Sequence, residues 1–495
     1  YFDCSVIKQD LILEMHFIKN VNSLYWHYLL INFTNFSITI NHYSVKTLAE
    51  NMDFKIGFLF SLFILLTHAN YISYKDYKVY KILPKNNEEV QILVDLQKDG
   101  ELIYWTDNIY VRNDVKIMVG PVKKIEFEAY LKKVGMEYNI VIHDVQSLID
   151  AQMNPPSRAN GNNGEYNWEH YQSVEEIYDW LQKIADDYPD VVSLVTIGTT
   201  LENRPIRGVI IDYKRNEDVT IGMIEGGIHA REWISPATVT WIISEFLTST
   251  DTNIRNLAEN VVWHIFPVTN PDGYAYTFTT NRMWRKNRNT SYNATCTPNP
   301  DMKNGVDLNR NFGYLWMTTG ASANPCAETF AGPEEFSELE SVAISNYVNV
   351  INNQGHLVYY FAFHSYSQMV LVPYSHVSGA AVLEAENYAD LYEIAIRGMD
   401  KLREHEVSGS SFDWVKGVVD VPIVYLFELR DVGEYGFLLP TELIVNNNRE
   451  IMDGLLEMDR ITRELGYYEH HYNYSGANTL KISAMLMLLL AVLIQ

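Results

Sequence analysis

Apolar and polar positions follow two alternating patterns in the chain from Trp168 onwards. Short apolar runs with the composition of buried strands recur between longer stretches with the spacing of helices. The strand-like runs are Val191–Ile197, Arg207–Ile211, Val219–Ile224, Val261–Pro267, Leu357–Phe363 and Ile423–Phe427. The helical stretches lie at about 234–249, 335–353, 384–404 and 440–464. This alternation predicts an α/β domain, with a mostly parallel or mixed sheet and helices on both of its faces.

The first helix of this domain is indicated by its start signal. Ser173 and Glu176 have the spacing of a capping box, and the apolar Ile177 and Leu181 follow at helical spacing. We expect the folded domain to span residues 166–466.

Residues 70–150 show a different mixture, which predicts a small α+β module ahead of that domain. Its strand candidates are Tyr77–Leu83, Val90–Leu96, Asp114–Val119 and Val134–Ile142, and its helix candidate is Ile125–Lys133. A stretch rich in Pro, Asn and Gly follows at 151–165, and neither a helix nor a strand would accommodate it. We interpret it as a linker, in which Arg158 offers an exposed cleavage site to a trypsin-like protease.

The N-terminal part of the chain contains an apolar segment of another kind. A lysine precedes the apolar run 56–66, and the small residue Ala69 follows it, as in a signal peptide at 52–69. The alternative is a buried helix at 54–66. Because a signal peptide belongs at an N-terminus, we interpret residues 1–51 as an upstream translation artefact.

The C-terminal tail, residues 467–495, has the outline of a lipid-anchor signal. The small residues Ser475-Gly476-Ala477 are followed by a short polar spacer and by the apolar run 484–494. A short membrane tail and a frayed apolar terminus are the alternatives. The sequence thus predicts a secreted protein that meets a membrane only through such an anchor.

Composition disfavours some classes of binding partner. Its 495 residues carry a formal net charge of −24 at pH 7, which disfavours binding to nucleic acids or to anionic membrane surfaces. Hydrophobic residues make up 47% of the chain, so it can bury a large core, and we expect a monomer. Sequons at Asn289, Asn293 and Asn473 fit an exported protein.

The cysteines are Cys4, Cys296 and Cys326. They are too few for a thiolate zinc site or for a disulfide framework. Cys296 and Cys326 flank a region rich in Pro and Asn, where a disulfide that closes a loop would form in an oxidising compartment. Two free thiols are the alternative.

Candidate metal ligands follow two of the predicted strands. His229 and Glu232 come shortly after Val219–Ile224, and His364 comes directly after Leu357–Phe363. Ligand crevices form where the strands of such sheets end. Two imidazoles and one carboxylate, with an open fourth position, are typical of a catalytic zinc shell. Each histidine alone would more often be a structural residue with one hydrogen bond, so the prediction depends on the three together.

Three further motifs accompany these candidates. They are Asn281-Arg282-Met283-Trp284-Arg285-Lys286, Asp307-Leu308-Asn309-Arg310-Asn311-Phe312 and Phe427-Glu428-Leu429-Arg430-Asp431. With them, the sequence resembles the zinc carboxypeptidases of the pancreatic A and B types over roughly residues 75–465. The resemblance implies an eight-stranded mixed sheet flanked by helices, and a zymogen whose ferredoxin-like pro-domain covers the active site until it is removed.

The resemblance also implies roles for single residues. His229, Glu232 and His364 would hold one zinc ion. Glu428 would act as the general base, because a carboxylate can take up the proton of a water molecule that the metal activates. Arg285 would stabilise the oxyanion, a role that suits a permanent charge in a dry site.

Four other residues are implied to contact the substrate or to support its site. Asn309 and Arg310 match the pair that grips the terminal carboxylate, because the forked donors of a guanidinium bind both oxygens. Arg231 and Arg282 would serve neighbouring subsites or structural pairs. The predicted activity is the zinc-dependent removal of single residues from the C-termini of peptides and proteins.

One segment departs from the family pattern. The family has a mobile tyrosine shortly before the run Ser408–Trp414, whereas Leu402–Val407 contains none and the loop is shortened. We therefore expect weaker substrate binding, and a catalytically impaired homologue that binds peptides is the alternative. Phe412 stands where a B-type enzyme carries a carboxylate, so we expect a preference for apolar terminal residues of small or medium size.

Overall fold

The computed structural model describes eight stretches of the chain. They are residues 71–98, 102–106, 109–155, 166–214, 220–296, 300–375, 384–398 and 408–469. The predicted signal peptide, the upstream residues, Arg158 and most of the C-terminal tail lie outside them. None of the described helices is both long enough and apolar enough to cross a membrane.

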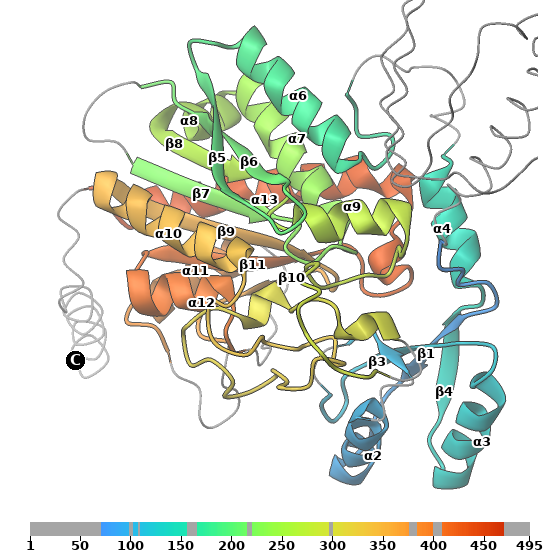
Figure 1. Cartoon of the computed structure of the whole chain (residues 1–495). Helices are drawn as coiled ribbons and strands as arrows, with labels where there is room; N and C mark the ends of the chain where they lie inside the picture. Colours follow the sequence, from blue (N-terminus) through green and yellow to red (C-terminus); the bar gives the residue numbers. More distant parts are fainter. Residues whose placement is uncertain are drawn as a thin grey trace, which may run out of the picture. The chain divides into compact units, whose positions relative to one another are not determined.

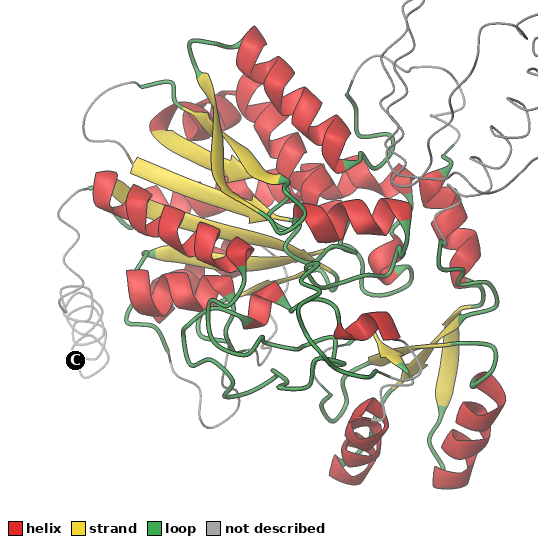
Figure 2. Ribbon diagram, viewed as in Figure 1, coloured by secondary structure: helices red, strands yellow, loops and turns green. Residues whose placement is uncertain are grey.

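A mixed sheet forms the centre of the larger domain (Figures 1 and 2). Its described strands are β5 (Val192–Thr199), β6 (Pro205–Ile211), β7 (Thr220–Gly226), β8 (Val261–Phe266), β9 (His356–Ser365), β10 (Met369–Leu371) and β11 (Ile423–Leu429). Their order is β10-β11-β9-β7-β8-β6-β5. The four central strands are parallel, and β10, β6 and β5 run antiparallel to their neighbours. The predicted α/β architecture with a mixed sheet is confirmed.

The expected number of eight strands was wrong for the described residues, whose main sheet has seven. That number came from the family resemblance, whereas the apolar pattern of the chain indicated six. The strand that the pattern did not indicate is β10, which pairs with β11 over three residues. A run of this length is too short to show the period of a strand in the sequence.

Helices cover both faces of this sheet, as predicted. One face packs against α6 (Val174–Asp187), α7 (Ile234–Thr248) and α8 (Thr252–Asn260), with α11 (Tyr388–Gly398) and α13 (Ile444–Glu464) in the same core. The other face packs against α10 (Leu339–Gln354) and α12 (Ser411–Trp414). Strand β11 serves both cores, because side chains on a strand alternate between its faces. Its Tyr425 and Phe427 enter the first core, and Val424 and Leu426 enter the second.

The remaining helical segments connect these layers. They are α9 (Pro271–Thr279), the 3-10 turns Pro300–Lys303, Leu308–Arg310, Gly436–Leu438 and Thr441–Leu443, and a π turn at Val415–Val419. The capping box that starts α6 is present, since the Ser173 and Glu176 side chains bond each other's backbone N–H. Cys296 and Cys326 form a disulfide, which confirms the predicted bridge over two free thiols.

The N-terminal module has the order β-α-β-β-α-β that a ferredoxin-like fold requires. Its elements are β1 (Lys78–Ile82), α2 (Asn87–Lys98), β2 (Ile103–Tyr104), β3 (Val115–Val119), α3 (Lys124–Val134) and β4 (Tyr138–Ile142), followed by α4 (Val145–Met153). The sheet is antiparallel in the order β2-β3-β1-β4.

Two strand predictions in this module need correction. Val90–Leu96 lies in α2, whose first turn holds two glutamates and whose apolar Val90, Leu93 and Val94 have helical spacing. Strand β4 begins at Tyr138 rather than Val134, because α3 continues that far. Gly135 ends α3 in the left-handed conformation, with φ of 75°.

Candidate active site

The three candidate metal ligands meet where two neighbouring strands end. Strand β7 ends at Gly226, three residues before His229, and His364 lies near the end of β9. The two strands are parallel neighbours, with Gly226 opposite Phe363, so their ends reach the same edge of the sheet. Gly227 allows the tight turn between strand and ligand, since its φ is 65°.

One ligand atom of each residue points to a common centre. The His229 Nδ1 lies 2.8 Å from Glu232 Oε1, the His364 Nδ1 lies 3.2 Å from Glu232 Oε2, and the two Nδ1 atoms are 3.1 Å apart. All three side chains are at most 4% exposed. Two buried imidazole nitrogens that face each other beside a carboxylate are the donor set of a zinc site. The residues present therefore fit this metal.

A second set of charges orients His229 from behind. Its Nε2 bonds Asp307 Oδ1 at 3.0 Å, and Asp307 Oδ2 accepts bonds from Nε and Nη2 of Arg285 at 3.0 and 2.8 Å. Burial opposes ionisation of Asp307, but Arg285, Arg310 and His229 hold the pKa of its carboxyl well below the usual range. An ionised partner on the second nitrogen fixes the orientation of a ligating histidine.

The same charges affect the protonation of His229. Burial and the Arg285 charge act to lower the pKa of its imidazole, but the Glu232 and Asp307 carboxylates raise that pKa above its ordinary value. Sequence reasoning quoted Asp307 within a motif but gave it no role. The sequence signal that could have indicated a role for Asp307 was its position in the same motif, two residues before Asn309.

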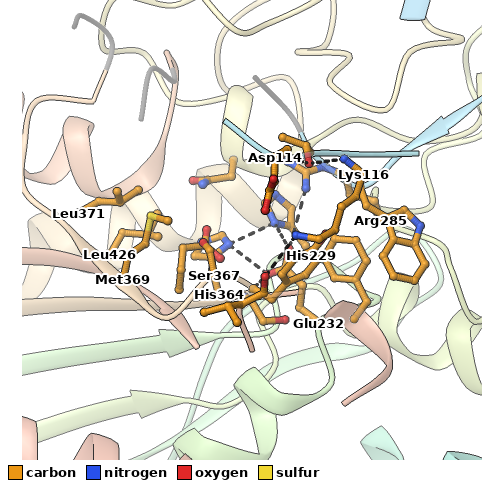
Figure 3. A pocket seen from close by; sticks show the side chains of 18 of the residues that line it. Asp114, Lys116, His229, Glu232, Arg285, His364, Ser367, Met369, Leu371 and Leu426 are labelled. Carbon is orange, nitrogen blue, oxygen red and sulfur yellow. Dashed lines mark hydrogen bonds and ion pairs between the residues drawn. The ribbon is translucent and has the colours of Figure 1, made fainter. Parts of the chain in front are cut away.

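The ligands lie in a pocket with most of the other predicted site residues (Figure 3). The lining residues from the larger domain include His229, Glu232, Arg285, Asn309, Arg310, His364, Phe412 and Glu428. Glu428 pairs with His364 in the register of β11 and β9, which brings its carboxylate group to the same edge of the sheet. Phe412 belongs to an apolar part of the wall with Met369, Leu371 and Leu426.

Arg231 and Arg282 differ in their surroundings. The Arg282 guanidinium donates to Gln152 Oε1 and to the carbonyls of Arg231 and Phe437, so it links α4 to two segments of the larger domain. Arg231 is also buried, but among the described residues its guanidinium makes no hydrogen bond. It lies 3.6 Å from Glu328 Oε2 and over the Phe437 ring.

The N-terminal module contributes to the same pocket. Trp105, Thr106, Asn113, Asp114 and Lys116 are among the lining residues. The Trp105 ring packs against Phe437 with centroids 5.3 Å apart, and the Lys116 Nζ donates to the Val432 carbonyl at 3.3 Å. The module thus forms part of the pocket wall and contacts the larger domain beside it. The tyrosine-free stretch 402–407 lies outside the described residues.

Comparisons with known proteins agree with this geometry. The sequence profile described as zinc carboxypeptidase matches residues 177–454, and that of the carboxypeptidase activation peptide matches residues 80–152. Zinc carboxypeptidase A 1 of Drosophila melanogaster is 35% identical over 79% of this chain and 92% of its own length. Human mast cell carboxypeptidase A is 33% identical over 75% of this chain and 90% of its own length.

A solved structure agrees as well. The crystal structure of carboxypeptidase A from Helicoverpa armigera superimposes with a TM-score of 0.70 at 27% identity, over 79% of this chain and 99% of the other. These relatives are carboxypeptidases by name, so they give no support to a peptide-binding homologue without activity. The chain belongs to the zinc carboxypeptidases and carries their activation peptide, which makes it the zymogen of a metallocarboxypeptidase.

Proposed function

We propose that the mature enzyme removes single apolar residues of small or medium size from the C-termini of peptides, with His229, Glu232 and His364 as the zinc ligands. The observation that carries this proposal is that these three residues line one pocket with Glu428, Asn309 and Arg310. Zinc in such a shell supplies Lewis acidity toward a carbonyl oxygen and a water molecule.

Glu428 and Arg285 perform the charge movements of the reaction. The Glu428 carboxylate takes a proton from the attacking water and gives it to the nitrogen of the leaving amino acid as the peptide bond breaks. Arg285 faces the pocket with a guanidinium held by Asp307, and it stabilises the negative charge that develops on the scissile carbonyl oxygen.

Asn309 and Arg310 make the enzyme an exopeptidase. Both line the pocket from the 3-10 turn Leu308–Arg310, and they bind the terminal carboxylate of the substrate. The last peptide bond of a substrate can reach Glu428 in the correct orientation, because the terminal carboxylate lies one residue away from it. An internal peptide bond has no carboxylate at that distance, so Asn309 and Arg310 do not orient it toward Glu428.

The apolar wall selects the terminal side chain. Met369, Leu371, Phe412 and Leu426 are uncharged, and Phe412 fills part of the space. A terminal Lys or Arg would lose its hydration there without finding a carboxylate. A terminal Leu, Val or Ala would bury its side chain at a gain of about 0.8 kcal/mol per methylene group.

The activation peptide blocks this pocket through Trp105 and Lys116, and cleavage at Arg158 by a trypsin-like protease releases it. Because the release is proteolytic, we expect activity only after treatment with trypsin, and a zinc chelator should then abolish it. The test is hydrolysis of blocked dipeptides that end in Phe, Leu, Ala, Lys or Glu, before and after trypsin and with and without a zinc chelator.

Release of apolar residues that requires trypsin and is lost with the chelator supports the proposal. Cleavage of Arg158→Gln to the same product would assign activation to another site. Zinc-loaded, trypsin-treated protein that releases no residue from any of these substrates would contradict the proposed activity.

A further inference from the structure

The side-chain amide of Asn309 has a fixed orientation. Its Oδ1 accepts the backbone N–H of Ser411 at 2.9 Å, and both groups are buried. Its backbone N–H donates to Asp307 Oδ1 at 3.1 Å. Within the described part of the chain, Nδ2 makes no hydrogen bond, and the residue lines the pocket. The amide therefore presents its donor group to the pocket, as a carboxylate ligand requires.

Ser411 is held in turn by a buried carboxylate that hydrolysis does not use. The Ser411 Oγ donates to Glu225 Oε1 at 2.5 Å, and the Tyr360 hydroxyl donates to the same oxygen at 2.7 Å. Glu225, Tyr360 and Ser411 are at most 1% exposed. Glu225 lies on β7 and Tyr360 on the adjacent β9, whereas Ser411 is in α12. The carboxylate thus ties α12 to the centre of the sheet.

We propose that Glu225 and Ser411 are positioning residues, which set the donor face of Asn309 toward the terminal carboxylate of the substrate. This inference rests on the proposed function, because it assigns Asn309 to that carboxylate. A buried carboxylate is costly unless it accepts hydrogen bonds. Both bonds to Glu225 reach Oε1, while Oε2 accepts none among the described residues, so the Ser411 and Tyr360 hydroxyls are the groups that hold this carboxylate in place. Loss of the Ser411 hydroxyl would free α12 from Glu225, and with it the Ser411 backbone N–H that orients the Asn309 amide.

A double-mutant cycle tests the relay on the activated enzyme. We expect Ser411→Ala to raise KM for a blocked dipeptide about tenfold, with kcat changed less than about twofold, as the loss of one oriented hydrogen bond predicts. In an Asn309→Ala background the same substitution should raise KM no further. Ser410→Ala is the matched control, since that hydroxyl caps α12 through Asp413 and does not contact Glu225.

Additive effects of Ser411→Ala and Asn309→Ala on KM would overturn the relay, as would a KM unchanged by Ser411→Ala. Glu225→Gln keeps an acceptor oxygen and should stay near the parent KM, whereas Glu225→Leu should match Ser411→Ala. If the parent enzyme itself released no residue, the proposed function would fail, and the cycle would not be run.

A second inference concerns the adjacent sequons at Asn289 and Asn293. The Nδ2 of Asn289 donates to Glu338 Oε2 at 3.0 Å and to the Tyr292 hydroxyl at 3.4 Å. Glu338 is 1% exposed and also binds Asn287, so the Asn289 amide is part of a buried network. A glycan on that nitrogen would displace it from Glu338.

Asn293 has the opposite surroundings. It is exposed, it lies in a loop, and its side chain makes no hydrogen bond within the described part of the chain. We infer that Asn293, and not Asn289, carries an N-linked glycan in the secreted protein. Its Nδ2 forms a bond to the anomeric carbon of an oligosaccharide carried on a polyprenyl pyrophosphate. The bond from that carbon to the pyrophosphate breaks, and the amide proton leaves with the pyrophosphate.

Peptide mass spectrometry of the protein secreted from insect cells tests this assignment. Treatment with a peptide N-glycosidase in heavy-oxygen water should convert Asn293 to labelled Asp and leave Asn289 unchanged. Asn293→Gln should remove one glycan mass, and Asn289→Gln should remove none from this segment. Label at Asn289, or none at Asn293, would overturn the inference.

Discussion

The N-terminal module and the larger domain both line the pocket, but they hold their residues there in different ways. In the larger domain, Asp307 orients His229, and Arg285 holds Asp307 through two bonds. In the module, Trp105 contributes an aromatic surface and Lys116 a bond to one carbonyl. Hydrolysis requires atoms at fixed distances and angles, which directional charged bonds provide. Covering a pocket requires surface rather than exact geometry, and the module provides it with the Trp105 ring and with the polar side chains of Thr106, Asn113, Asp114 and Lys116.

This difference predicts that the two regions respond separately to substitution. Changes in the larger domain should alter the reaction without releasing the cover. Changes in the module should alter the cover without altering the activated enzyme.

The largest effect is expected for Glu428→Gln. The amide cannot accept a proton, so kcat of the activated enzyme should fall about 10³-fold, with zinc content and Tm unchanged. Glu259→Gln serves as the control, because Glu259 is exposed on α8 and pairs with Arg255. The measurement is kcat with a blocked dipeptide that ends in Leu. If the variant retained more than a tenth of the parent kcat, Glu428 would be excluded as the general base.

A smaller effect, on specificity, is expected for Phe412→Asp. A carboxylate in the apolar wall should attract the ammonium group of a terminal Lys. The ratio of kcat/KM for Lys over Leu should therefore rise about a hundredfold. Phe412→Asn is the neutral control, which should lower kcat/KM for a terminal Leu without raising kcat/KM for a terminal Lys. Equal ratios in the two variants would mean that Phe412 does not contact the terminal side chain.

An effect on the zymogen alone is expected for Trp105→Ala. Trp105 is 4% exposed, and its truncation removes apolar contact worth about 3–5 kcal/mol. The uncleaved chain should hydrolyse dipeptides about tenfold faster than the parent, because part of the lost contact loosens the cover. After trypsin, the two should be equal. Tyr130→Ala, at a half-exposed site of the same module, should leave the zymogen unchanged, and the same result for Trp105→Ala would contradict the assigned cover.

The smallest effect on activity, though not on stability, is expected for His264 in β8. Burial lowers the pKa of its imidazole to about 4 in the folded protein, whereas an unfolded histidine has a pKa of about 6.5. The unfolded state therefore binds more protons between these values, and stability falls as the pH falls through that window, by about 3 kcal/mol.

Urea unfolding at pH 7 and pH 4.5 measures this contribution. His264→Phe should be less sensitive to acid than the parent, with kcat of the activated enzyme at pH 7 unchanged. An acid sensitivity equal to that of the parent would show that other groups titrate in this window.

Much of the fold and the zinc site could be predicted from local patterns. Apolar runs marked six of the seven strands of the main sheet, and the capping box marked the start of α6. The errors lie where the local signal is weak. Val90–Leu96 mixes the spacings of helix and strand, and β10 is three residues long. Family resemblance supplied the count of eight strands, which the described residues of this chain do not reach.

By itself, the sequence determined the family of this protein, its ligand types and the order of its motifs, because these depend on residue identity and spacing. The tertiary structure alone decided which distant groups meet. His229 and Asp307 are 78 residues apart in the chain, and Glu225 and Ser411 are 186 apart. It also decided which of two similar sequons is exposed. Such contacts depend on how β7, β9 and α12 pack, and packing is a property of the whole core, which no short stretch of sequence encodes.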